Sequence, residues 1–250
     1  MASWSTKRKY TYFFVFIVFV VLAVGLPVFF LTYESPTCSD GKQNGSERGI
    51  DCGGSCTRLC PAEFLSPRVL WSYSMNVATG IYNALAYVEN PNQSVKAKSL
   101  GYSFKLFDER GLLVSERKGK AFIPAGQKFA IFEGGIKTGE RIPVKTTFEF
   151  NEGVEWERSV QLSGLRTLTI DLEQGTEPKA EAKVKNESVD RVFSSVDAFI
   201  VIYDEKDNRL AFSKTIIETL NPGEITTLYF TWPEAFSGKA LRSEVIFVAK

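Results

Sequence analysis

The chain has 250 residues, with 30 basic and 29 acidic side chains and a formal net charge of +1. Nucleic-acid binders need clustered positive charge, so this balance predicts no nucleic-acid partner. Histidine is absent, which removes the commonest general base and the commonest metal ligand. The 20 Phe against 2 Met favour β-sheet cores over helical bundles.

Residues 10–33 contain an apolar run long enough to cross a bilayer. Residues 12–31 carry no charge, and a helix of that length spans the ~30 Å hydrocarbon core. Basic residues at 7–9 precede the run, so residues 1–9 are predicted to form a cytoplasmic tail and the remainder to lie outside the cell membrane. The alternative is a cleaved signal peptide, which has a shorter apolar core and a small-residue cleavage site. The length and the bulky outer end favour an uncleaved single-pass anchor.

Residues 34–61 contain all four cysteines: Cys38, Cys52, Cys56 and Cys60. In an oxidising space outside the cell such a cluster forms two disulfides, and three pairings are possible. A segment this short cannot bury a core of its own, so covalent bonds are its natural source of stability. A zinc site is the weaker interpretation, because the spacing contains no C-x2-C pair.

The same segment alternates oxygen-bearing side chains with glycines. Asp40, Asn44, Glu47 and Asp51 could supply ligands to one Ca²⁺, since calcium prefers six to eight oxygens and glycines let a short loop fold around the ion. The alternative is that the Asp-Gly and Asn-Gly pairs simply form tight turns. The pattern is not an EF-hand loop, and the sequence leaves both interpretations open.

The string from Cys38 to Cys60 reads C-x-D-G-x-x-N-G-x-E-x-G-x-D-C-G-G-x-C-x-x-x-C. It resembles a short cysteine motif that recurs in surface proteins of bacteria and archaea, usually beside β-sandwich or repeat domains. The resemblance covers about a tenth of the chain. It implies an exported surface protein of a prokaryote and no particular activity.

Beyond Pro61 the sequence changes to short alternating apolar and polar runs, which predict half-buried strands. The runs repeat at a spacing of about 96 residues: an Asn-containing turn at Asn90 and Asn186, then an acidic turn at Asp108 and Asp204. The fold is therefore predicted to be mainly β, with two tandem antiparallel β-sandwich domains at residues 62–164 and 165–250. Extra strands are expected at 144–150 and 154–162.

Residues 104–108 read Phe-Lys-Leu-Phe-Asp, and residues 199–204 read Phe-Ile-Val-Ile-Tyr-Asp. Both resemble the Phe-x-Leu-Tyr-Asp signature of small immunoglobulin-like domains in prokaryotic envelope proteins. The first has Phe in place of Tyr, and the second has one residue too many. The resemblance implies an immunoglobulin-like fold with interaction roles and carries no catalytic residues.

The sequence contains no phosphate-binding glycine loop and no G-x-S-x-G motif, so we expect no enzyme. Ser115 and Lys118 meet the bare S-x-x-K pattern but lie on a predicted strand, where the pair cannot share a helical turn. The acidic turn residues should be solvated, which does not suit acid-base catalysis.

Two tryptophans and three sequons are further candidates for surface features. Trp156 and Trp232 could mark a partner site, although a Trp in a sandwich core is the commoner case. The sequons begin at Asn44, Asn92 and Asn186, and the last two are expected to be exposed.

The leading expectation is a membrane-anchored, non-catalytic binding or structural protein with a protein partner at the cell surface, contacted through an exposed sheet edge. The second is an accessory subunit of a secretion, pilus or envelope complex that docks through the Phe-rich anchor helix. The third is an extracytoplasmic enzyme, which the missing histidine disfavours.

Overall fold

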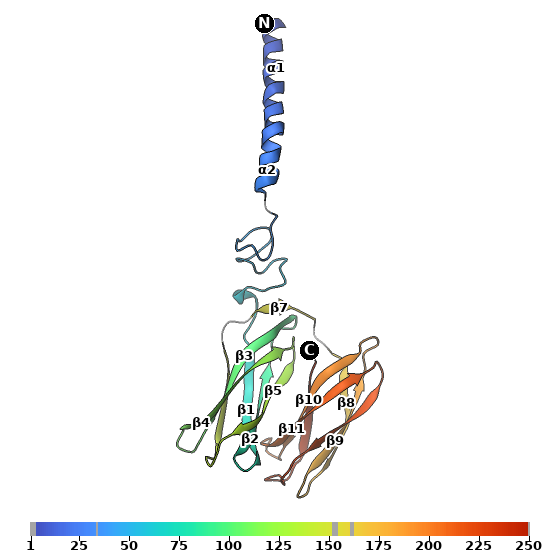
Figure 1. Cartoon of the computed structure of the whole chain (residues 1–250). Coiled ribbons are helices and arrows are strands. Elements are labelled where there is room, and N and C mark those ends of the chain that lie inside the picture. Colours follow the sequence, from blue (N-terminus) through green and yellow to red (C-terminus); the bar gives the residue numbers. More distant parts are fainter. Residues whose placement is uncertain (1–3, 34, 152–154, 161–162, 250) are drawn as a thin grey trace.

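The computed structural model describes every residue except 1–3, 34, 152–154, 161–162 and 250. The chain begins with a long helix, continues through the cysteine-rich segment, and ends in two β units that lie side by side (Figure 1). The fold is mainly β, with antiparallel sheets, one N-terminal apolar helix and two disulfides, which confirms the predicted fold class at that level.

The N-terminal helix is α1 (Trp4–Val20), followed by a π-helical turn (Val21–Gly25) and α2 (Leu26–Thr32). The π-helical turn lies directly before Pro27, which has no N–H and whose ring crowds the preceding helical turn. The residues from Lys7 to Thr32 are long and apolar enough to cross a membrane, although a signal sequence would meet the same test. None of this span is buried by the rest of the described chain.

The first β unit consists of two antiparallel sheets. One has the strand order β1-β2-β5, and the other has β4-β3-β6 with β7 also paired to β3. The strands are β1 (Arg68–Ala78), β2 (Ile81–Glu89), β3 (Val95–Phe107), β4 (Leu113–Ile123), β5 (Lys128–Lys137), β6 (Lys145–Phe150) and β7 (Trp156–Arg158). Of the two extra strands expected here, β6 matches the first, whereas β7 is shorter than the second, whose ends fall partly outside the described residues.

The second β unit repeats this plan with sheets ordered β12-β9-β8 and β11-β10-β13. Its strands are β8 (Leu165–Glu173), β9 (Lys179–Asn186), β10 (Phe193–Tyr203), β11 (Arg209–Leu220), β12 (Ile225–Thr231) and β13 (Arg242–Val248). The order matches strand for strand: β8, β9 and β12 correspond to β1, β2 and β5, and β10, β11 and β13 correspond to β3, β4 and β6. The predicted domain boundary lies between β7 and β8.

The repeat extends to individual hydrogen bonds. The buried Asn90 donates its side-chain amide to the carbonyls of Val95 and Pro124, both at 2.7 Å. Ninety-six residues later, the buried Asn186 donates to the carbonyls of Arg191 and Leu220 at 2.7 and 3.0 Å. Each amide therefore connects the end of β2 or β9 to the neighbouring ends of a strand pair in the other sheet, β3 and β4 or β10 and β11, which explains why Asn stands at both positions.

The acidic turns match as well. The Oδ1 atom of Asp108 accepts the backbone N–H groups of Arg110 and Leu112, and that of Asp204 accepts those of Lys206 and Asn208. These bonds stabilise the turn between strands β3 and β4 and the turn between β10 and β11.

Candidate functional site

The residues from Cys38 to Cys60, here called the collar, connect the helix to the β units. Two disulfides cross within it, Cys38–Cys56 and Cys52–Cys60, so the first cysteine pairs with the third and the second with the fourth. The sequence predicted two disulfides and left three pairings open. The two overlapping disulfides link the whole segment covalently. The described part of the chain contains no free cysteine.

The loops of the collar pass so close to each other that one position, Gly54, requires glycine. At Gly54, where φ is +60°, a Cβ atom would lie 1.7 Å from the backbone oxygen of Ser46. No other residue could occupy that position without moving the Cys38–Cys56 loop. The Gly-Gly pair of the motif therefore has a structural reason.

Three of the predicted calcium ligands, Asp40, Glu47 and Asp51, act as hydrogen-bond acceptors in turns. The fourth, Asn44, donates its amide, and its Oδ1 atom is buried without a hydrogen-bond partner in the described part of the chain. Both carboxylate oxygens of Asp51 lie 3.0 Å from the N–H of Gly41, and Glu47 accepts the N–H of Asn44 at 3.2 Å. Asp40 accepts the Asn44 amide at 2.9 Å, and this bond lowers the pKa of the Asp40 carboxyl, with further help from the backbone N–H of Lys42. Within the described residues, Asp40, Glu47 and Asp51 do not form a group with oxygens within 4.8 Å of one another. Hydrogen bonding in turns therefore accounts for the three carboxylates, and the Ca²⁺ site stays a prediction.

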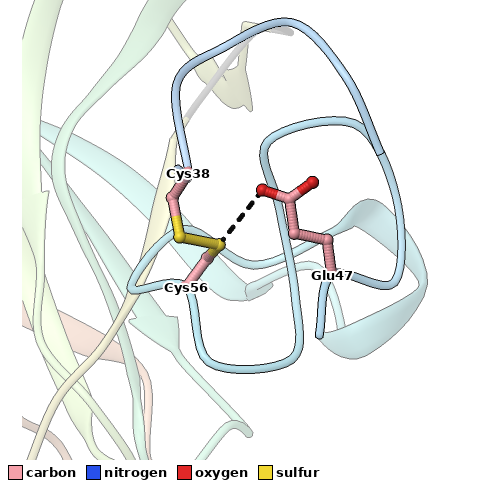
Figure 2. A group of neighbouring side chains, drawn as sticks. All are labelled: Cys38, Glu47 and Cys56. Carbon is pink, nitrogen blue, oxygen red and sulfur yellow. Dashed lines mark hydrogen bonds between the residues drawn. A yellow bond between two sulfur atoms is a disulfide. The ribbon is translucent and has the colours of Figure 1, made fainter. Parts of the chain in front are cut away.

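One other group in the collar has the spacing of metal ligands: Cys38, Glu47 and Cys56 (Figure 2). The Cys56 sulfur lies 3.5 Å from Oε1 of Glu47. However, both sulfurs belong to one disulfide and carry neither a proton nor a thiolate charge, so they are not ligands for a metal ion. The contact instead places a half-buried carboxylate against a disulfide.

The collar is joined to the first β unit by backbone pairing. Arg58 forms a β-bridge with Glu157. Two backbone hydrogen bonds flank this bridge. The N–H of Leu59 donates to the carbonyl of Trp156 at 2.9 Å, and the N–H of Arg158 donates to the carbonyl of Thr57 at 3.2 Å. Strand β7 thus pairs with the collar on one side and with β3 on the other. Residues 57–59, at the end of the collar, therefore extend the edge of this sheet.

Side chains reinforce this junction. The Trp156 ring is buried under Phe64, with ring centroids 4.9 Å apart. Trp232 is likewise buried, and its indole N–H donates to the carbonyl of Phe212 at 3.0 Å. The hypothesis that these two tryptophans form an exposed partner site is wrong, because both fill space between elements of the fold.

The sequon asparagines also have structural roles. Asn92 exchanges hydrogen bonds with the backbone of Leu65, at 2.7 and 2.8 Å, just beyond the collar. Asn186 is fully buried, so the prediction that it is exposed is wrong. The partly buried Asn44 donates to Asp40 within the collar. A glycan on any of the three amides would replace one N–H of the side-chain nitrogen that donates these bonds.

The two β units share a continuous apolar interface. The face of sheet β1-β2-β5 that points away from its own partner sheet packs on the outer face of β11-β10-β13. Phe132 of β5 lies 6.0 Å from Phe212 of β11 and 6.3 Å from Phe199 of β10, centroid to centroid, and Tyr73 of β1 lies 6.3 Å from Phe212. Phe199, Val201 and Phe212 are buried there.

Polar contacts lie at the edge of this interface. The Tyr87 hydroxyl donates to Glu244 at 2.7 Å, and Glu244 in turn pairs with Arg242, whose guanidinium lies over the Tyr203 ring. Burial, followed by the hydrogen bond to Glu244, raises the pKa of Tyr87 well above its usual value of 10.0. On another part of the interface the Arg209 guanidinium lies 5.2 Å from the centre of the Trp71 ring.

We did not predict this interface, although the sequence contains a signal for it. Residues 84–88 of β2 and 198–203 of β10 are uninterrupted apolar runs, and every one of them is buried. A strand in a sheet with one solvated face alternates, whereas a continuous run indicates burial on both faces.

The two residues of the S-x-x-K pattern lie on a strand. Ser115 and Lys118 both lie on β4, as predicted, and Lys118 pairs with Glu116 at 3.6 Å. Hydrogen bonds lower the pKa values of the Asp108 and Asp204 carboxyls, chiefly those from Arg141 and Asn208 respectively. A general acid needs the opposite shift.

Comparison with known proteins adds no family to this description. No protein-family model matches the chain, and no curated protein is significantly similar to it in sequence.

Proposed function

We propose that this is a non-catalytic, membrane-anchored protein that presents two immunoglobulin-like domains on the outer side of the membrane to a protein partner. The observation that carries the proposal is the series of connections that runs from the collar through both β units. Crossed disulfides lock the collar, β-bridges join the collar to β7, and aromatic packing joins the two β units. These connections hold the surfaces of the two β units in a set arrangement beyond the collar.

The compartment follows from the chemistry of the collar. Paired cysteines persist in oxidising environments, which agrees with a position outside the cytoplasm. The basic residues before the apolar helix agree with a cytoplasmic N-terminus. The shared strand order of the two units, with antiparallel sheets in pairs, supports the resemblance to immunoglobulin-like envelope domains.

Cysteine labelling in whole cells tests the topology. Thr169→Cys lies on an exposed position of β8, and Lys9→Cys lies before the apolar run. We expect a membrane-impermeant maleimide to label Thr169→Cys on intact cells and Lys9→Cys only after permeabilisation. The wild-type protein is the control, since its four cysteines are paired. Labelling of Lys9→Cys on intact cells, or loss of residue 9 from the mature chain, would contradict the anchor.

An anchor exchange tests where the partner binds. Replacing residues 10–33 with an unrelated membrane helix leaves the collar and the β units unchanged. If the outward domains bind the partner, crosslinking in intact cells should capture the same neighbour from both proteins. Loss of that neighbour in the exchanged protein would favour the alternative, an accessory subunit that docks through its helix.

A further inference from the structure

Strand β12 is an edge strand that lacks the usual protection. It pairs with β9 on one side, and no described strand pairs with its other side. It reads Ile-Thr-Thr-Leu-Tyr-Phe-Thr and is the one strand, among those the structure describes, without a charged residue. Edge strands normally carry charges, prolines or bulges that prevent pairing with other chains. The edge strand β4 follows that rule, with Glu116, Arg117, Lys118 and Lys120.

The ladder shows which backbone groups of β12 are open. Just beyond its ends, the N–H of Asn186 donates to the carbonyl of Glu224, and the N–H of Trp232 donates to that of Pro178, both at 3.0 Å. In an antiparallel ladder such bonds alternate, so the even-numbered residues of β12 point their N–H and C=O groups at β9. The odd-numbered residues point theirs away, toward the open edge: Ile225, Thr227, Tyr229 and Thr231.

The side chains of these four residues lie on the outer face of the sheet, because Leu228 and Phe230 between them are buried. Ile225 is 54% and Tyr229 is 63% exposed. In the first unit, Phe132 occupies the position that corresponds to Tyr229. Phe132 pairs with Leu85 and Tyr229 pairs with Glu181. Leu85 and Glu181 are equivalent positions of the repeat, 96 residues apart. Phe132 is covered by the second unit, whereas Tyr229 is covered by nothing in the described chain.

We propose that β12 pairs with β12 of a second copy of this chain, antiparallel and centred on Leu228. This register places Thr227 opposite Tyr229 of the second copy and Ile225 opposite Thr231. Each of the four residues whose backbone N–H and C=O point to the open edge then lies opposite such a residue of the second copy. Each of these four pairs exchanges two backbone hydrogen bonds, about eight in all. Pairs of β-branched and aromatic side chains in this arrangement are favourable.

The absence of charge argues for a second copy as the occupant. In a symmetric pair a strand meets its own sequence reversed, so any charge near its centre meets a like charge. The same pairing of β4 would place Lys118 opposite Lys118 of the second copy, which is unfavourable. No residue of β12 creates such a conflict.

The pairing also sets the orientation of the two copies. The strands extend from the collar end of the molecule toward its far end (Figure 1), and antiparallel partners run in opposite directions. The two collars therefore lie at opposite ends of the pair. Together with the membrane anchor of the proposed function, on which this step rests, the geometry joins copies held in two facing membranes.

Sedimentation velocity of the full chain in detergent tests the pairing without depending on the membrane. We expect wild-type protein to show a concentration-dependent dimer. The double variants Thr227→Lys/Tyr229→Lys and Thr227→Glu/Tyr229→Glu place like charges opposite each other, and each should weaken association about tenfold or more. An equimolar mixture of the two should associate again, because every Lys then faces a Glu.

Thr169→Lys adds a charge to the same face of the sheet on the opposite edge strand, β8, and should dimerise like wild type. A monomeric wild-type protein, a mixture that fails to associate, or a loss of the dimer in Thr169→Lys would each overturn the proposal. A cooperative urea unfolding transition, compared with that of the wild-type protein, shows whether each variant is folded.

Liposomes carrying the full chain test the orientation. Two fluorescently distinct populations should cluster when both carry wild-type protein and remain separate when one carries the Lys/Lys variant. A dimer in detergent without clustering would overturn the facing-membrane arrangement and leave the strand pairing intact. Capture of a strand from a different protein by wild-type β12, with no dimer formed, would replace the second copy as the occupant.

Discussion

The sheets β1-β2-β5 and β8-β9-β12 have the same strand order in the two halves of the chain. Their outer faces differ, because the first is aromatic and covered whereas β9 of the second carries exposed charged residues. The outer face of the first carries Trp71, Tyr73 and Tyr87, and the second unit covers it. Glu181 and Lys183 of β9 take the positions that Leu85 and Tyr87 have in β2, and both are exposed. A sheet face that another unit covers carries apolar side chains, whereas a face in contact with solvent carries charged ones.

The strongest test of this comparison uses Phe132 and Tyr229, which occupy the same position in the two sheets. Phe132→Ala removes a ring packed between Phe199 and Phe212 and should lower the free energy of unfolding by about 3 kcal/mol. Tyr229→Ala removes an exposed ring and should change it by less than about 0.5 kcal/mol. Urea unfolding of both variants and the wild-type protein measures these changes in the free energy of unfolding. Equal effects would mean that the interface contributes nothing to stability.

A second test asks whether the repeated asparagines are equivalent. Asn90→Ala and Asn186→Ala each leave two backbone carbonyls without their amide donor, at a cost of about 2 kcal/mol. Because the two sites have the same bonds, we expect midpoint shifts of similar size in the same urea assay. Asn208→Ala, in an exposed turn, is the control and should shift the midpoint much less. A large effect at only one asparagine would contradict the structural repeat.

The smallest expected effect concerns Tyr87, whose counterpart in the second unit is Lys183. The folded-state pKa of Tyr87 is raised above the unfolded value of about 10, because burial and Glu244 favour the neutral hydroxyl. Its contribution is therefore fully present below pH 10 and is lost as the pH rises above 10, where the unfolded chain ionises first. In Tyr87→Phe, the decline of unfolding free energy between pH 9 and 11 should be shallower than in wild type.

Tyr229→Phe is the control for that experiment, since its hydroxyl belongs to an exposed side chain. It should reproduce the wild-type dependence on pH. An identical alkaline decline in Tyr87→Phe and wild type would show that the hydrogen bond to Glu244 does not hold the interface.

Local sequence patterns were sufficient for the elements and their repetition. Alternating apolar residues, the Asn90 and Asn186 turns and the acidic turns all act over a few residues, so their consequences follow from short stretches of chain. The two disulfides followed from the number and crowding of the cysteines. Contacts between distant segments did not follow. The pairing of Cys38 with Cys56, the burial of Trp156 and the roles of Asp40 and Asp51 as turn acceptors all depend on how loops pass one another.

The sequence by itself determined a mainly β chain behind an apolar helix, because hydrophobic period and length are properties of consecutive residues. Only the tertiary structure decided which faces of the sheets are covered. Phe132 and Tyr229 are both aromatic residues of a similar strand, yet one lies in an interface and the other at an open edge. That difference arises because burial depends on what packs against a residue in space, and residues in contact across this interface are separated by up to 157 positions along the chain.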